Sequence, residues 1–174
     1  TFGWAMAVFT GVFVSAAASG AHLNPAVTIG LAIKTGDWSK VPMYIAAQIC
    51  GAMFGSFLVW LSYRQHFDET PDGDTKMAAF CTSPAIKSPL NNFISEAVAT
   101  FAFMMAVLFL TSPEAKLGSI DALPVALVVL AIGLSLGGTT GYAINPARDL
   151  GPRIVHFLLP MKNKRDSDWR YSWV

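Results

Sequence analysis

SGAHLNPAV, at residues 19–27, returns later in the chain as TGYAINPAR, at residues 140–148. Both stretches follow a hydrophobic segment, contain a glycine where the chain bends, and then present Asn-Pro-Ala. Asn is favoured at the cap before a helix, and Pro is favoured at the first helical position, where its missing N–H loses no partner. We therefore expect each motif to begin a helix, and we interpret the pair as an internal duplication.

The helices that these motifs begin are too short to cross a membrane. Residues 26–33 after the first motif are apolar, and residues 147–159 after the second carry charged side chains. A helix needs about 20 residues to span the hydrocarbon core of a bilayer. Non-helical backbone at membrane depth is tolerated only where protein buries it or where it lines a watery cavity. We therefore expect two re-entrant half-helices.

The composition is typical of a multi-pass membrane protein. Of the 174 residues, 53% are hydrophobic and 13% are charged, which is the wrong balance for a soluble domain of this length. Long stretches with no charged residue, or with one, predict four spanning helices, at residues 1–19, 42–63, 93–112 and 122–139. An odd number of spans separates the two motifs, so the half-helices enter from opposite faces and can meet near the midplane.

We interpret residues 1–174 as one transmembrane domain. It consists of two repeats and a loop that connects them. The first repeat covers 1–63, the connecting loop 64–91 and the second repeat 92–174. The connecting loop mixes charged residues with prolines, and we expect it to have little structure of its own. The chain opens directly in an apolar span with no processing site, so Thr1 is not expected to be its natural beginning.

Several classes of function are excluded by what the sequence lacks. A net charge of +1 gives no electrostatic case for binding nucleic acid. Cys50 and Cys81 lack the partners and spacing of a metal site, and no nucleophile–base pair or phosphate-binding glycine loop is present. We therefore expect no enzymatic activity, no cofactor and no metal. We expect the protein to be integral to the plasma or inner membrane.

The point where the half-helices meet has a defined chemistry. Two helix N-termini aim partial positive charge at one place, and the side-chain amides of Asn24 and Asn145 can donate N–H groups into a lumen. Such a place repels cations and accommodates the oxygen of water or of a hydroxyl group. The candidate pore motifs are Asn24, Pro25, Ala26, Asn145, Pro146 and Ala147.

These paired motifs, with SGAH before the first and Arg148 after the second, resemble the aquaporin or major intrinsic protein family. The resemblance covers nearly the whole chain. It implies an all-α membrane protein, an inverted-repeat helical bundle with six full spans and two re-entrant half-helices, of which the first and sixth spans are missing here. It also implies a homotetramer in the lipid bilayer, with one pore in each subunit.

The resemblance also places the narrowest point of the pore, at Trp4, Gly133, Tyr142 and Arg148. Water-selective members typically have His at the place of Gly133, so the glycine leaves room for carbon. Trp4 and Tyr142 would form an apolar corner, and Arg148 would donate to hydroxyl oxygens. The implied function is a passive channel for glycerol and other small neutral polyols plus water, which excludes protons and ions.

Four further residues would line or support this pore: His22, Glu96, Gly141 and Asp149. By resemblance, His22 presents a nitrogen to the lumen and Glu96 accepts hydrogen bonds from the second re-entrant loop. Asp149 directly follows the filter arginine, and a basic residue, Arg153, comes four positions later; both features resemble the glycerol-conducting branch.

Alternatives accompany these assignments. Trp4 also fits an interfacial tryptophan, Gly133 a small residue at a helix contact, and His22 a hydrogen-bonded core histidine. A strict water channel is the alternative within the family, and a closed pore that serves membrane contact is another. An ion-coupled secondary transporter would also use inverted repeats, but it would need buried carboxylates, and only Glu96 lies within a span.

Overall fold

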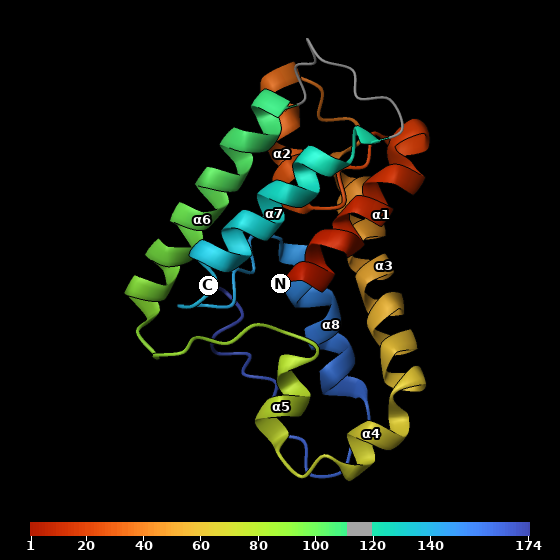
Figure 1. Cartoon of the computed structure of the whole chain (residues 1–174), viewed down its shortest axis with the longest axis vertical. Coiled ribbons are helices and arrows are strands. Elements are labelled where there is room, and N and C mark those ends of the chain that lie inside the picture. The colour runs from red at the N-terminus through yellow and green to blue at the C-terminus, as the bar shows by residue number, and fades with distance from the viewer. Residues whose placement is uncertain (111–119) are drawn as a thin grey trace.

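The computed structural model of the chain describes residues 1–110 and 120–174, and the elements in this part form an all-α fold (Figure 1). The helices are α1 (Phe2–Ser19), α2 (Pro25–Thr35), α3 (Val41–Ser62), α4 (Arg64–Glu69), α5 (Gly73–Ala78), α6 (Pro89–Leu110), α7 (Leu123–Ser135) and α8 (Pro146–Leu158).

Three of the helices are long and apolar enough to cross a membrane: α1, α3 and α6. They match three of the predicted spans, except that the last two residues of the predicted span 93–112 lie outside the described residues. Many large apolar side chains on these helices point outward, such as Phe13, Phe54 and Phe101. Such a surface suits hydrocarbon, because lipid tails are as apolar as the side chains themselves.

The fourth predicted span, 122–139, is shorter than expected. Helix α7 has 13 residues, Leu123–Ser135, and the next five residues form turns. At 1.5 Å per residue this helix is about 20 Å long, which is less than the thickness of a bilayer core. These turns contain Gly137 and Gly138, and glycine disfavours continuation of a helix by about 1 kcal/mol per residue.

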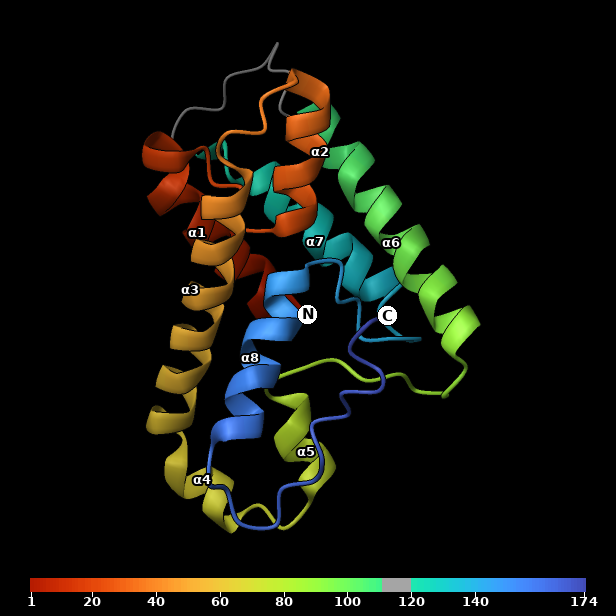
Figure 2. The same ribbon diagram turned by 180° about the vertical axis from the view of Figure 1, so that it is seen from behind.

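The two half-helices are present, with 11 residues in α2 and 13 in α8. They contact one another, and α2 also contacts α3 and α6, whereas α8 contacts α3. Figures 1 and 2 show α2 extending toward one end of the molecule and α8 toward the other. The inverted arrangement predicted from the repeated motifs is therefore the one observed.

The connecting loop is more structured than predicted, because it contains α4 and α5. Helix α5 is capped by Asp72, whose carboxylate accepts from the backbone N–H groups of Asp74 and Thr75. The loop packs under α8 together with the C-terminal segment, residues 159–174 (Figure 2). Their shared apolar cluster consists of Phe67, Met77, Phe80, Cys81, Val155, Leu159 and Met161.

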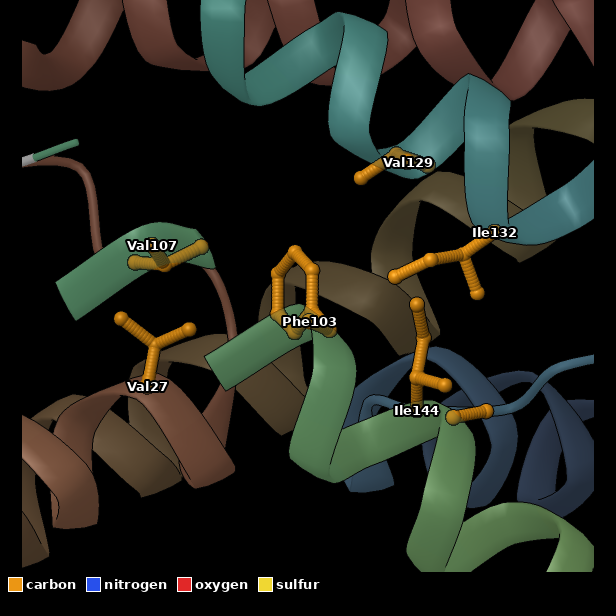
Figure 3. Packing of buried hydrophobic residues seen from close by; sticks show 7 residues of the cluster. Val27, Phe103, Val107, Val129, Ile132 and Ile144 are labelled. Carbon is orange, nitrogen blue, oxygen red and sulfur yellow. The ribbon is translucent and has the colours of Figure 1, made fainter. Parts of the chain in front are cut away.

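A second apolar cluster joins α2, α6, α7 and the turn before α8 (Figure 3). In Figure 3, Phe103 of α6 lies between Val107 and Val27 on one side and Val129, Ile132 and Ile144 on the other. Ile144 directly precedes the second Asn-Pro-Ala motif. The cluster therefore fixes the loop that carries this motif against the membrane helices.

Candidate functional site

The two loops that precede the half-helices adopt the same unusual backbone conformation. In each loop the glycine and two later residues have positive φ angles, which are uncommon for residues other than glycine. The equivalent pairs are Gly20 (74°) and Gly141 (81°), Ala21 (49°) and Tyr142 (42°), and Leu23 (53°) and Ile144 (42°). The duplication seen in the sequence thus extends to backbone conformation, and strained backbone of this kind clusters at functional sites.

Asn24 and Asn145 tie the two motifs together reciprocally. Asn24 Nδ2 donates to the carbonyl of Ile144 at 2.9 Å, and Asn145 Nδ2 donates to the carbonyl of Leu23 at 3.0 Å. Each Oδ1 atom caps its own half-helix, at 2.8 Å from the N–H of Ala26 and 3.0 Å from that of Ala147. The N-termini of α2 and α8 therefore meet.

This geometry bears on the expectation that each amide can donate an N–H group into a lumen. Each amide has two N–H groups, and one of them holds the opposite repeat. Both asparagines nevertheless border a cavity, so the second N–H of each can face its interior. Pro25 and Pro146 occupy the first helical positions, as expected, and Ala26 and Ala147 supply the capped N–H groups.

The cavity has a volume of about 610 Å³ and lies between α1, α2, α6, α7 and the two re-entrant loops. Its polar wall includes His22, Asn24, Asn145 and Arg148. Its apolar wall is formed by side chains of the four helices, among them Val8, Val12, Val27, Leu31, Phe103, Val107, Val125 and Val129. The lining of this one cavity therefore combines hydrogen-bonding groups with hydrocarbon.

Three of the four predicted filter residues come together beside this cavity. The guanidinium carbon of Arg148 lies 4.6 Å from the ring centroid of Trp4 and 5.8 Å from that of Tyr142. Both distances fall within the range of cation–π attraction. The aromatic rings thus hold the arginine by their faces, an arrangement that does not occupy its N–H groups, and all three side chains border the cavity.

Gly133, the fourth predicted filter residue, lies against Tyr142 and is not among the residues that line the cavity. A Cβ atom at this position would lie 2.9 Å from Cζ of Tyr142 and would also collide with the methyl group of Thr1. A Cβ at Gly137 would lie 2.6 Å from Cδ1 of the same ring. The space that Gly133 leaves is filled by the Tyr142 ring, which lies against Gly133 and Gly137.

Glu96 is buried in α6 and binds the second re-entrant loop. Its two carboxylate oxygens accept from the backbone N–H groups of Ala143 at 2.9 Å and Ile144 at 3.0 Å. This is the contact that the family resemblance implies. Because both oxygens are used in this way, the carboxylate satisfies backbone groups that lipid could not satisfy.

His22 borders the cavity and is also anchored beneath it. Its Nδ1 lies 3.2 Å from Oγ1 of Thr28, which donates to the carbonyl of Asn24 and accepts from Nε2 of Gln48 at 2.9 Å. Thr28 thus holds the ring through Nδ1, and Nε2 lies outside this contact.

Asp149 and Gly141 support the site from outside the cavity. Asp149 binds Arg153, at 2.8 Å between Nε and Oδ2 and 3.0 Å between Nη2 and Oδ1. Arg153 is fully buried and also donates to the carbonyls of Thr82, Ser167 and Asp168. The sequence analysis singled out Asp149 and Arg153 but not Thr82. Nothing in the local sequence of the connecting loop indicates that Thr82 binds these residues.

The chain is similar to known proteins of one family. The family model "Major intrinsic protein" matches residues 1–174. A probable glycerol uptake facilitator protein of Thermotoga maritima is 52% identical, and a glycerol uptake facilitator protein of Streptococcus pneumoniae is 50% identical. Each match covers the whole of this chain and 74% of the relative.

A solved structure is also similar. The aquaglyceroporin from Plasmodium falciparum superposes with a TM-score of 0.86 at 36% identity, over 99% of this chain and 72% of that one. The fold and the integral membrane location expected from the sequence are thereby confirmed. With two capped half-helices meeting at their Asn-Pro-Ala ends, and with a family match along its whole length, the chain belongs to the major intrinsic protein family.

Proposed function

We propose that this chain forms a passive channel for glycerol and other small neutral polyols together with water. The observation that carries the proposal is the cavity, whose lining contains both asparagines and Arg148 together with many apolar side chains. A polyol has hydroxyl groups and carbon on the same short molecule, so it can use both walls at once. The names of the relatives, glycerol uptake facilitators and an aquaglyceroporin, support this choice of solute.

The electrostatics of the site favour neutral solutes. The N-termini of α2 and α8 meet beside the cavity, and each brings partial positive charge. Arg148, which also lines the cavity, adds a full positive charge. Protons and cations would be repelled by this combination, and Arg148 or half-helix dipoles are the features by which aquaporin-type pores exclude them.

Passive conduction is favoured over ion-coupled transport and over catalysis. Both oxygens of Glu96 are taken by backbone N–H groups, so this carboxylate is not free to hold a coupling ion. Within residues 1–110 and 120–174, no group of His, Cys, Asp and Glu side chains could hold a metal. We further propose that the chain has no enzymatic activity and that it assembles as a homotetramer in the lipid bilayer, like the family it belongs to.

We assign the filter roles as follows. Trp4 and Tyr142 form the apolar corner that receives the carbon backbone, and Arg148 donates to hydroxyl oxygens. Gly133 acts indirectly, because the absence of its side chain lets the Tyr142 ring lie against α7 instead of across the cavity. His22 offers Nε2 to a solute hydroxyl further along the same cavity.

The test is solute flux into proteoliposomes, measured by stopped-flow light scattering with water and glycerol gradients in turn. The purified protein is expected to conduct both solutes without saturation and without dependence on ions. Water flux without glycerol flux would show a strict water channel instead, and saturable, ion-dependent uptake would show a coupled transporter.

One substitution tests the site within the same assay. In Gly133→Ala the new methyl group collides with the Tyr142 ring, so the ring moves toward the cavity and glycerol flux falls more than water flux. Gly55→Ala is the matched control, because a Cβ at Gly55 meets no atom within 4 Å. Equal loss of both fluxes in Gly133→Ala would argue against the role given to Tyr142.

A further inference from the structure

Thr82 lies in the connecting loop, outside both repeated motifs, and yet it contacts both the second half-helix and the loop that precedes it. The residue is buried and does not border the cavity. It lies between α5 and α6, on a part of the chain that carries none of the residues assigned above to conduction. Its contacts nevertheless converge on the two segments that carry Tyr142 and Arg148.

The first contact is with the residue that follows Arg148. The backbone N–H of Thr82 donates to Oδ1 of Asp149 at 2.7 Å, and the hydroxyl group of Thr82 donates to the same oxygen at 2.6 Å. The carbonyl of Thr82 accepts from Nη2 of Arg153 at 2.8 Å. Hydrogen bonds to charged groups are about twice as strong as those between neutral groups. The first turn of α8 is therefore fixed against Thr82.

The second contact is with the residue that precedes Tyr142. A Cβ atom at Gly141 would lie 3.2 Å from Cγ2 of Thr82 and 3.4 Å from its Cβ, so the threonine side chain packs directly on the glycine. Gly141 has a φ of 81°, a left-handed conformation that other residues adopt only with strain. A hydrogen bond of 3.0 Å from the N–H of Ala85 to the carbonyl of Thr139 holds the same loop nearby.

We infer that Thr82 is a positioning residue that sets the distance between Tyr142 and Arg148, and through it the size of the polyol that passes. Its methyl group braces the loop beside Tyr142, and its hydroxyl group braces the helix turn beside Arg148. The two segments that carry these filter side chains both contact this one threonine. The inference rests on the proposed function, because it concerns the selectivity of the same constriction.

Two substitutions separate the two contacts. Thr82→Val keeps the shape of the side chain and removes the hydroxyl bond to Asp149, whereas Thr82→Ser keeps that bond and removes the methyl group against Gly141. The matched control is Thr70→Val, since the hydroxyl of Thr70 is bonded to the carbonyl of His66 within its own helical turn. All three variants are compared with the wild-type protein in proteoliposomes.

The measured quantity is the ratio of glycerol permeability to xylitol permeability, because this ratio does not depend on how many channels are active. Thr82→Val is expected to lower the ratio by about threefold or more, a modest share of what a hydrogen bond to a charged group contributes. Thr82→Ser is expected to lower it by about twofold, since only the weaker contact is lost. Thr70→Val is expected to leave it unchanged.

Loss of both fluxes by one factor, with the ratio unchanged, would show that Thr82 serves folding alone and would overturn the inference. If Thr82→Val does not reach the membrane, the ratio in Thr82→Ser decides in the same way. A wild-type protein that passes glycerol, with variants of unchanged ratio, contradicts only this inference. A wild-type protein that passes no glycerol contradicts the proposed function itself.

Discussion

The two half-helices begin in the same way but are held in place by different forces. Alignment of the Asn-Pro-Ala motifs pairs Thr28 of α2 with Asp149 of α8, and Ala32 with Arg153. All four side chains are buried. In α2 these positions are uncharged, whereas in α8 they form an ion pair with two short contacts between carboxylate and guanidinium.

The difference follows from what each half-helix packs against. The buried face of α2 meets helices, and Thr28 hydrogen-bonds there to the side chain of Gln48. Helix α8 also meets irregular backbone in the connecting loop and the C-terminal segment, and Arg153 donates to three carbonyl groups of these segments. Buried carbonyl groups need donors, and a guanidinium supplies five N–H groups in fixed directions. In these two helices, the buried positions are charged where the neighbouring segments are loops and uncharged where they are helices.

Removal of the buried arginine should cause the largest effect. In Arg153→Met the Asp149 carboxylate loses its charged partner in a buried site, and the carbonyls of Thr82, Ser167 and Asp168 lose their donors. Breaking a buried pair in this way costs about 3–5 kcal/mol. We expect a correspondingly lower free energy of unfolding, measured by thermal or denaturant unfolding in detergent micelles.

The double variant Asp149→Asn/Arg153→Met is the control for charge. It leaves no unpaired carboxylate, and the Asn oxygen can still accept from Thr82, so part of the lost stability should return. A single variant as stable as the wild-type protein would mean that α8 does not depend on the ion pair and that the contrast with α2 is only apparent.

The next largest difference between the two half-helices should come from substitution of the glycines that face neighbouring helices. A Cβ at Gly151 of α8 would lie 3.0 Å from the carbonyl oxygen of Ile49 and 3.2 Å from the backbone nitrogen of Met53, both in α3. A Cβ at Gly30 of α2 would meet only the side chain of Met104, whose flexible end can move.

Gly151→Ala is therefore expected to cost up to about 3 kcal/mol, and Gly30→Ala about 1 kcal/mol or less. The comparison uses the same unfolding assay for both variants. An equal cost would show that α3 yields as easily as a methionine side chain, which the rigidity of a helix backbone argues against.

The uncharged anchor of α2 should be weaker than the ionic anchor of α8. Thr28→Val removes the hydroxyl that accepts from Gln48 and pairs with His22, and leaves these half-buried groups without that partner. The expected loss is about 1–2 kcal/mol. Thr28→Ser keeps the hydroxyl and should lose less, so unfolding of the pair separates the hydrogen bonds from the packing of the methyl group.

The parts of the fold that depend on local signals were predictable from the sequence. Asn-Pro at a helix start and uninterrupted apolar stretches act within a few residues, and both half-helices and three long helices were predicted within a few residues of their observed bounds. The start of α5 could also have been predicted, since Asp72 precedes Thr75 at the spacing of a capping aspartate. The mixed charges of the loop instead led to the prediction of little structure.

The parts that depend on contacts between distant segments were not predictable. Gly133 was grouped with Tyr142 only through the family resemblance, because the two residues belong to different segments. The bonds from Thr82 to Asp149 likewise join a loop to a helix far along the chain. The contact of Glu96 was anticipated only through the family resemblance, since a lone buried carboxylate does not indicate which backbone groups it binds.

The smallest effect should appear as a difference in alkaline stability between the two apolar clusters. In the described part of the chain, the buried members of the cluster around α2 include no titratable side chain, whereas those of the cluster around α8 include Cys81. Burial raises the pKa of the Cys81 thiol from 9.0 to about 11. The folded state thus favours the neutral thiol, and this contribution is fully present below about pH 9 and is lost as the pH rises through about 11. We expect the free energy of unfolding to fall by about 1 kcal/mol by pH 10 from this group alone.

The Cys81→Ala variant isolates the contribution, because alanine does not titrate. Burial also raises the pKa of Tyr171, to about 12, so the wild-type protein loses stability above pH 10 for a second reason. The relevant quantity is therefore the difference between the pH slopes of the two proteins from pH 8 to pH 10, whatever the absolute stability of the variant. Parallel slopes would mean that the thiol is solvated in the native state, and that the connecting loop packs on α8 more loosely than the buried contacts of Thr82 and Arg153 require.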